Sequence, residues 1–238
     1  MTTSEAPESP IERVRSQTFG VRLAAPALVI TFRSPCLVAS WAPLHGGFRT
    51  GVSHLLNYQV PRNSESTAPE TILRRAAGKM GIKGAFVGML TSADVRQFSS
   101  AKAAYGGLCV SAISMILLEN PATVGEPSTV EPHSTRVDDL TLIVIVNRHL
   151  THEAMLEGMS LATEAKVKTM YELGLMSRRR DQPASGMRCE CVAIASAGAG
   201  HHQISGKHSK LGELIGAACL ESLRAAVHSR KSTSVESN

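Results

Sequence analysis

The stretch "LTLIVIVN", residues 140–147, is the most apolar run of the chain, and "THEAMLEGMSLATEAKVKTMYELG", residues 151–174, follows it directly. An unbroken apolar run of this length predicts a buried strand, and the 3.6-residue period of the second run predicts a helix over 155–174. Further along the chain, strands alternate with helices only in part. We therefore predict an α/β or α+β fold, a single domain whose mixed, partly antiparallel sheet is flanked by helices.

Other segments extend this prediction in both directions. Pro69 and the glycines that follow frame a helix over 69–82, and another helix closes the chain from about 210. The expected strands cover 84–95, 105–120 (a strand or a strand pair), 189–198, and two short strands within 27–41 that form a hairpin broken at Ser34-Pro35.

Composition indicates the domain boundaries. Residues 1–10 and 229–238 are rich in Ser, Thr, Glu and Pro, which predicts disordered tails around a domain over 11–228. Residues 120–139 carry prolines and many hydroxyl side chains, which predicts an irregular loop or insertion.

The charge and composition favour some partners over others. The formal net charge is +5, but the basic residues are scattered apart from Arg178–Arg180, and aromatic residues make up only 4%. A nucleic-acid partner is therefore not favoured. We expect a cytoplasmic protein without a membrane span, because no signal peptide, no paired cysteine framework and no apolar run of membrane-spanning length is present. The sequence leaves open whether the protein forms a homo-oligomer.

One lysine of the helix over 155–174 stands out. On a helical wheel Lys166 falls in the middle of an apolar stripe, whereas Glu164 falls on the opposite side and Thr163 at the border of the stripe. A lysine among apolar residues extends its ammonium to solvent, pairs with an acid, or serves a site.

The run "GKHSKLGELIGAACLESL", residues 206–223, opens the last helix. Ser209 is the expected N-cap, but a capping box would need an acid at 212, where this chain has glycine, so capping leaves Glu213 unexplained. His208, Ser209 and Lys210 bring a base, a hydroxyl and a cation to a helix start that itself favours anions. The glycines at 212 and 216 indicate either close backbone packing or close approach of a ligand.

A metal site is not predicted. His201, His202 and His208 lie in or beside a glycine-rich loop and have no acid or cysteine pair at ligand spacing. Cys189 and Cys191 are interpreted as small residues on one face of a strand.

Four further runs occur in this order along the chain: "HLLNYQVP" (54–61), "VGMLTSADVR" (87–96), "LATEAKVKTMYELG" (161–174) and "GKHSKLGELIGAA" (206–218). Together they resemble the adenosylcobinamide amidohydrolases, the CbiZ-type enzymes of corrinoid salvage. The resemblance extends from about Phe32 to about Val227. This chain departs from the family pattern in three places. It has "SAISM" (111–115) where members tend to carry a Gly-Leu-Ser-Asn-like run, and "SGMRCE" (185–190) where they tend to carry Thr-Gly-Thr with a following Asp. It has Gly206-Lys207-His208 where they usually have Gly-Thr-His.

The resemblance implies hydrolysis of the amide between the propionyl arm of the corrin ring and aminopropanol, which gives adenosylcobyric acid. It implies no cofactor of the protein's own, since the cobalt belongs to the substrate. The residues expected to bind substrate are His54, Asn57, Thr91, Asp94 and Thr163.

The expected catalytic residues are His208, Ser209, Lys210, Glu213, Lys166 and Glu164. Two routes stay open for them. Ser209 attacks with His208 as base, or water attacks with Glu213, Glu164 or Asp94 as base; Lys210, Lys166 or the helix N-terminus then holds the oxyanion. A corrinoid- or tetrapyrrole-binding protein without catalysis, and hydrolysis of a different amide, are the alternatives.

Overall fold

The computed structural model describes residues 11–61, 68–127 and 137–235. Its helices are α1 (Pro69–Lys79), α2 (His152–Glu172) and α3 (Lys210–Val235), with a short 3-10 helix η1 (Val95–Gln97). Its strands are β1 (Ile11–Arg15), β2 (Phe19–Ala24), β3 (Ala27–Ser40), β4 (Gly47–Gln59), β5 (Ala85–Thr91), β6 (Ser99–Tyr105), β7 (Leu108–Ile116), β8 (Pro121–Ala122), β9 (Leu140–Val146), β10 (His149–Leu150), β11 (Gly186–Met187), β12 (Glu190–Ser196) and β13 (His201–His202).

Nine of these strands form one mixed sheet in the order β1-β2-β3-β12-β9-β7-β6, from which β4 and β5 branch at β3. β12 lies parallel to β9 and antiparallel to β3, and β7 is antiparallel to β9. The predicted single domain with a mixed, partly antiparallel sheet flanked by helices is confirmed. The apolar run that opened the sequence analysis is β9, a strand whose seven residues are all buried.

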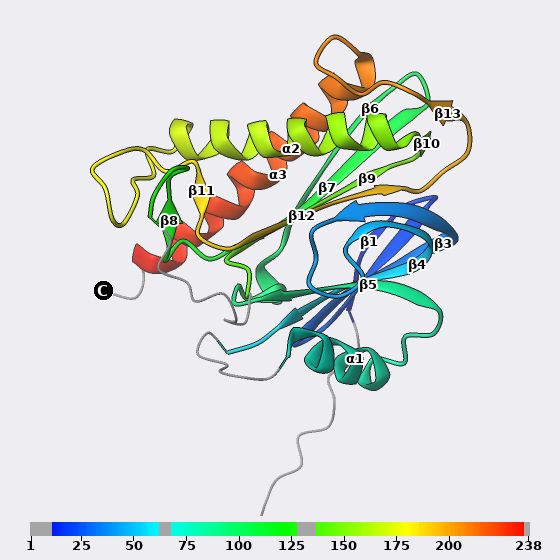
Figure 1. Cartoon of the computed structure of the whole chain (residues 1–238), viewed down its shortest axis with the longest axis horizontal. Coiled ribbons are helices and arrows are strands. Elements are labelled where there is room, and N and C mark those ends of the chain that lie inside the picture. The colour runs from blue at the N-terminus through cyan, green and yellow to red at the C-terminus, as the bar shows by residue number, and fades with distance from the viewer. Residues whose placement is uncertain (1–10, 62–67, 128–136, 236–238) are drawn as a thin grey trace, which may run out of the picture.

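The buried apolar residues form three clusters: one beneath α2 and α3, one between the two halves of the folded sheet, and one beneath α1. Helices α2 and α3 cross over one face of β12, β9, β7 and β6, and α1 lies on the far side of the molecule against β4 and β5 (Figure 1). Apolar side chains from the other face of β7, β9 and β12 pack against those of β2 to β5, so the sheet folds back on itself. The helices α2 and α3 therefore cover an outer face of this folded sheet, and β12 runs beneath α2.

The hairpin predicted at Ser34-Pro35 is wrong. Residues 27–40 form the single strand β3, whose pairing with β4 shifts register between Thr31 and Cys36. Pro35 has no N–H to donate to a ladder, and an irregularity of this kind lets a strand continue past it.

α3 continues to Val235, so seven residues of the segment predicted as a tail from 229 have helical backbone geometry. Within 120–139, residues 121–122 form β8, which pairs with β11. The predicted tail over 1–10 and residues 128–136 of the predicted irregular loop lie outside the described residues.

None of the described helices is long and apolar enough to cross a membrane.

Candidate functional site

Lys166 and Glu190 form a buried ion pair between α2 and the first residue of β12. The side chain of Lys166 is 9% exposed and that of Glu190 is 14% exposed, and the Lys166 ammonium contacts Glu190 Oε2 directly. The other carboxylate oxygen, Glu190 Oε1, accepts a hydrogen bond of 2.5 Å from the backbone N–H of Met187. The apolar stripe of α2 thus carries a lysine because an acid from the sheet meets it there.

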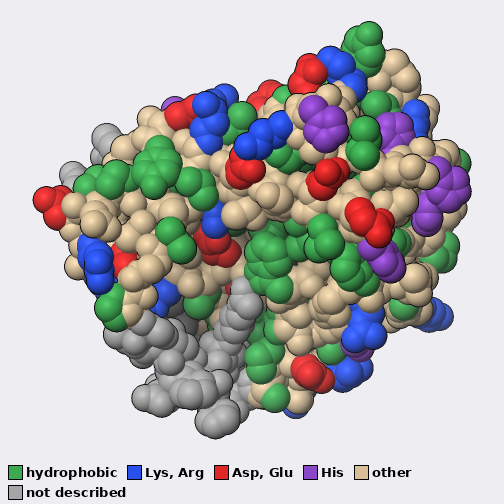
Figure 2. Space-filling view, turned by 45° about the horizontal axis from the view of Figure 1, so that its top comes forward, with side chains coloured by type: hydrophobic (Ala, Val, Ile, Leu, Met, Phe, Trp, Pro, Cys, Tyr) green, Lys and Arg blue, Asp and Glu red, His purple; other side chains and the backbone are tan. Residues whose placement is uncertain are grey.

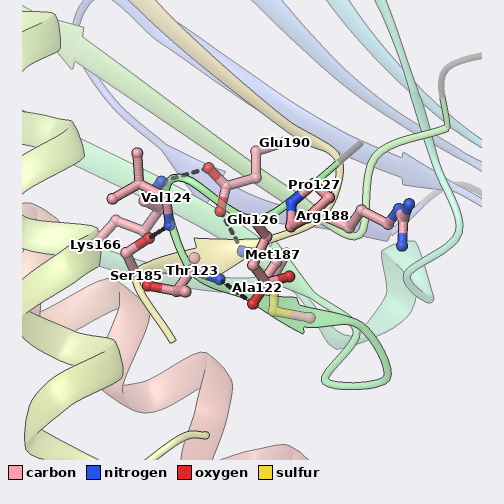
Figure 3. Close-up of a pocket in the computed structure, with 11 residues that line it drawn as sticks. Ala122, Thr123, Val124, Glu126, Pro127, Lys166, Ser185, Met187, Arg188 and Glu190 are labelled. Atoms are coloured by element: carbon pink, nitrogen blue, oxygen red, sulfur yellow. Dashed lines mark hydrogen bonds and ion pairs between the residues drawn. The ribbon is translucent and has the colours of Figure 1, made fainter. Parts of the chain in front are cut away.

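This pair lies at a cavity of about 360 Å³ between α2 and the β8–β11 ribbon (Figure 3). The loop before β11 is tied to the segment after β8, since Ser185 Oγ accepts a hydrogen bond of 2.9 Å from the backbone N–H of Val124. The cavity is lined by Ala122, Thr123, Val124, Glu126, Pro127, Lys166, Ser185, Gly186, Met187, Arg188 and Glu190.

Gly186 allows the backbone of β11 to pass directly over the pair. A Cβ atom at this position would lie 2.8 Å from Lys166 Nζ and closer still to Glu190 Oε1. Both distances are shorter than van der Waals contact, about 3.5 Å or more between heavy atoms. A side chain here would displace one or both charged groups.

The arrangement is suited to hydrolysis. Burying two charges costs desolvation energy that their attraction often does not recover, so an ion pair with so little exposure is weak evidence for stability. A carboxylate can take a proton from an attacking water, and an ammonium beside it can stabilise the negative oxygen that develops on the carbonyl. Both groups face one cavity in which a substrate arm could lie.

The start of α3 is built differently. Ser209 Oγ accepts a hydrogen bond of 3.0 Å from the N–H of Gly212 and donates one of 2.8 Å to the carbonyl of Gly206. The predicted N-cap is thereby confirmed. Because the hydroxyl proton points to a backbone carbonyl, the expected donation from Ser209 to His208 is not formed in this structure.

The charged neighbours of Ser209 are exposed. Lys210 pairs with Glu213 one turn along α3, and its ammonium lies 4.7 Å from the centre of the Tyr105 ring. Glu164 pairs with Lys207 at 2.5 Å, with both side chains more than half exposed. Glu164 and Lys166 come from different sides of α2, so the cluster at the start of α3 and the cavity pair are separate groups.

Glu157 of α2 is a structural residue that the sequence analysis did not identify. Its Oε2 accepts hydrogen bonds from the N–H groups of Ser205 (2.6 Å) and Gly206 (2.9 Å), which holds the turn before α3 against α2. This turn passes so close to α3 that a Cβ on Gly212 would lie 2.7 Å from the carbonyl carbon of Gly206. Close backbone packing therefore explains Gly212.

The five residues expected to bind substrate are engaged in the fold and do not line the cavity of Lys166. Two of them stabilise the region of β4. His54 hydrogen-bonds Thr31 Oγ1 (3.1 Å) and the carbonyl of Lys83 (3.0 Å), and burial lowers its pKa below the ordinary value. Asn57 is buried and its amide contacts Met115 Sδ at 3.1 Å.

The other three serve turns and helix termini. Thr91 donates to the carbonyl of Asp138 at 3.0 Å, and Asp94 caps η1 by accepting from the N–H of Arg96 at 3.0 Å. Thr163 donates to the carbonyl of Met159 within α2 at 3.0 Å. Their predicted contact with substrate stays a prediction.

Glu190 was not among the predicted site residues. It ends the run "SGMRCE" (185–190), one of the places where this chain departs from the resembled family, so the sequence marked the segment but not the acid. Among the described residues, no group of three or more His, Cys, Asp or Glu side chains is arranged to hold a metal ion.

Comparison with known proteins gives two findings. The sequence profile of the family described as "Adenosylcobinamide amidohydrolase" matches residues 10–234. A curated protein of Methanosarcina mazei named "Adenosylcobinamide amidohydrolase" is 28% identical over 131 residues, which make up 55% of this chain and 58% of that relative. The match thus spans less than two thirds of the relative's length.

Proposed function

Since this chain belongs to the adenosylcobinamide amidohydrolase family, we propose that it hydrolyses the amide bond between the propionyl arm of the corrin ring and the aminopropanol of adenosylcobinamide. The products are adenosylcobyric acid and aminopropanol, and the step serves cobalamin salvage in the cytoplasm. The observation that carries the proposal is the Lys166–Glu190 pair buried at a cavity beside β11.

In the proposed reaction the scissile carbonyl lies against Lys166 Nζ and a water molecule lies against Glu190. Glu190 takes a proton from this water as its oxygen bonds to the carbonyl carbon, and the oxyanion that forms is stabilised by the ammonium of Lys166. When the C–N bond breaks, the proton held by Glu190 passes to the leaving amine. The scheme needs only these two side chains and water, and the cobalt remains a part of the substrate.

The backbone N–H of Met187 has a positioning role in this scheme. Its bond to Glu190 Oε1 holds the carboxylate in one orientation, and Gly186 leaves no side chain between the pair and the cavity. The route in which Ser209 attacks is less well supported, because the Ser209 hydroxyl caps α3.

The test is hydrolysis of adenosylcobinamide by the purified protein, followed by mass spectrometry of adenosylcobyric acid. We expect the wild-type protein to form this product, and Lys166→Met and Glu190→Gln each to lower kcat by at least about a hundredfold, the size of losing an acid–base or electrostatic group. Lys168→Met is the matched control. Lys168 lies two residues along the same helix, is 59% exposed and pairs with Glu172, so its loss should leave kcat unchanged.

Two results would contradict the proposal. Binding of adenosylcobinamide without release of product by the wild-type protein would favour a corrinoid-binding protein that lacks catalysis. Wild-type turnover in a folded Lys166→Met protein would show that the Lys166–Glu190 pair is not needed for hydrolysis.

A further inference from the structure

A strip of protein surface runs along one side of α2 and ends at the Lys166–Glu190 pair. His152, Met159 and Lys166 are spaced seven residues apart, so they lie on the same side of the helix. At 1.5 Å per residue the strip is about 21 Å long. Lys166 closes one end by contacting Glu190, and His152 closes the other by contacting a phenylalanine of the sheet.

That phenylalanine is Phe48 of β4, and strand register places it on the α2 side of the sheet. Phe48 pairs with Ala39, and Ala39 pairs with Ile194 of β12. Ala39 and Ile194 belong to the core beneath α2 and α3. The Phe48 ring lies 4.4 Å from the ring of His152, centre to centre, and is 40% exposed.

Trp41, the one tryptophan of the chain, directly follows β3 and is tied to the other end of the strip. Its indole N–H donates a hydrogen bond of 2.8 Å to the backbone carbonyl of Glu190, yet the side chain remains 38% exposed. The hydrogen bond positions the indole against the residue that we propose as the general base.

Exposed aromatic side chains thus stand at both ends of this strip, where exposure of their apolar rings to water costs free energy. Aromatic rings bury a large apolar area when they find a partner, so rings left this exposed beside a cavity favour a binding site. Figure 2 shows hydrophobic side chains gathered in the middle of one face, beside a hollow in which a basic and an acidic side chain meet. The hydrogen bond from Trp41 to the backbone of Glu190 places one exposed aromatic ring beside the pair.

We propose that Trp41, Phe48 and Met159 form the surface on which the corrin macrocycle of the substrate stacks, so that its propionyl arm reaches the Lys166–Glu190 pair. This inference rests on the proposed hydrolysis. The occupant is a broad conjugated ring with apolar faces, which suits aromatic and thioether side chains. The hydrogen bond from Trp41 to the backbone carbonyl of Glu190 joins one side of this surface to the reacting groups.

The test combines binding and turnover in the full chain. Dicyanocobinamide, which has the macrocycle but no adenosyl group, is titrated while the fluorescence of Trp41 is followed. We expect Phe48→Ala to raise the Kd for dicyanocobinamide and the KM for adenosylcobinamide about tenfold, the scale of losing one aromatic stacking partner, with kcat within twofold of wild type. Tyr171→Ala removes an aromatic ring of similar exposure (52%) and serves as the control with unchanged Kd.

Each outcome separates the two proposals. Unchanged Kd and KM in Phe48→Ala would overturn the stacking surface while leaving the hydrolysis intact. Quenching by 5′-deoxyadenosine together with no binding of dicyanocobinamide would overturn it too, because the strip would then hold the adenine. If wild-type protein forms no adenosylcobyric acid but dicyanocobinamide binds with the predicted loss in Phe48→Ala, the stacking surface stands and the hydrolysis fails.

Discussion

Replacing Gly186 with alanine tests the geometry of the Lys166–Glu190 pair without removing either charge. The added Cβ would lie 2.8 Å from Lys166 Nζ and 3.0 Å from Glu190 Cδ, and closer still to Glu190 Oε1. Ordinary contact between such atoms needs about 3.5–4.0 Å, so the charged groups must move by about 1 Å. A displacement of about 1 Å at reacting groups can cost about a hundredfold in rate.

We therefore expect Gly186→Ala to lower kcat for adenosylcobinamide by about a hundredfold, measured by steady-state formation of adenosylcobyric acid. The free energy of unfolding, measured by denaturant titration, should fall by about 1–3 kcal/mol, as for other overpacked interiors. Gly216→Ala is the matched control, because a Cβ at this position in α3 meets no atom within 4 Å. The control should keep full turnover and gain up to about 1 kcal/mol of stability, since alanine favours helix over glycine.

The reasoning fails if Gly186→Ala folds, is destabilised as expected and still turns over at the wild-type rate. The displaced ion pair would then have no part in the chemistry. Loss of turnover in Gly216→Ala would equally count against it, because that substitution disturbs no side chain near the cavity.

Two further predictions concern other parts of the chain. Ser209→Ala should lower the free energy of unfolding by about 1 kcal/mol, the contribution of a serine N-cap, and leave kcat within twofold of wild type. A hundredfold loss of kcat would instead indicate that Ser209 takes part in catalysis. Burial raises the pKa of the Cys36 and Cys219 thiols to about 12, so at pH 8 only about one part in ten thousand of each is thiolate. Mass spectrometry after iodoacetamide treatment of the folded protein should find the partly exposed Cys109 modified before either; equal rates for all three thiols would contradict the buried placement.

The sequence by itself determined the features that depend on neighbouring residues. The apolar run of β9, the periodicity of α2 and the capping serine of α3 were each predictable, because hydrophobic period and capping chemistry act within one or two turns of chain. Lys166 was singled out for the same reason, as a charge within an apolar helical stripe. The four runs shared with the amidohydrolases indicated the family.

Tertiary structure alone decided which acid meets Lys166 and which surface surrounds the pair. Glu190 lies 24 residues along the chain from Lys166, and their contact requires β12 to run beneath α2 between β9 and β3. The pairing of β3 with β4 and β12 places Phe48 beside His152 and Trp41 beside Glu190. More than a hundred residues of sequence separate the members of each pair. Strand order and register arise from packing over the whole sheet, so no local pattern of residues could have shown these partners.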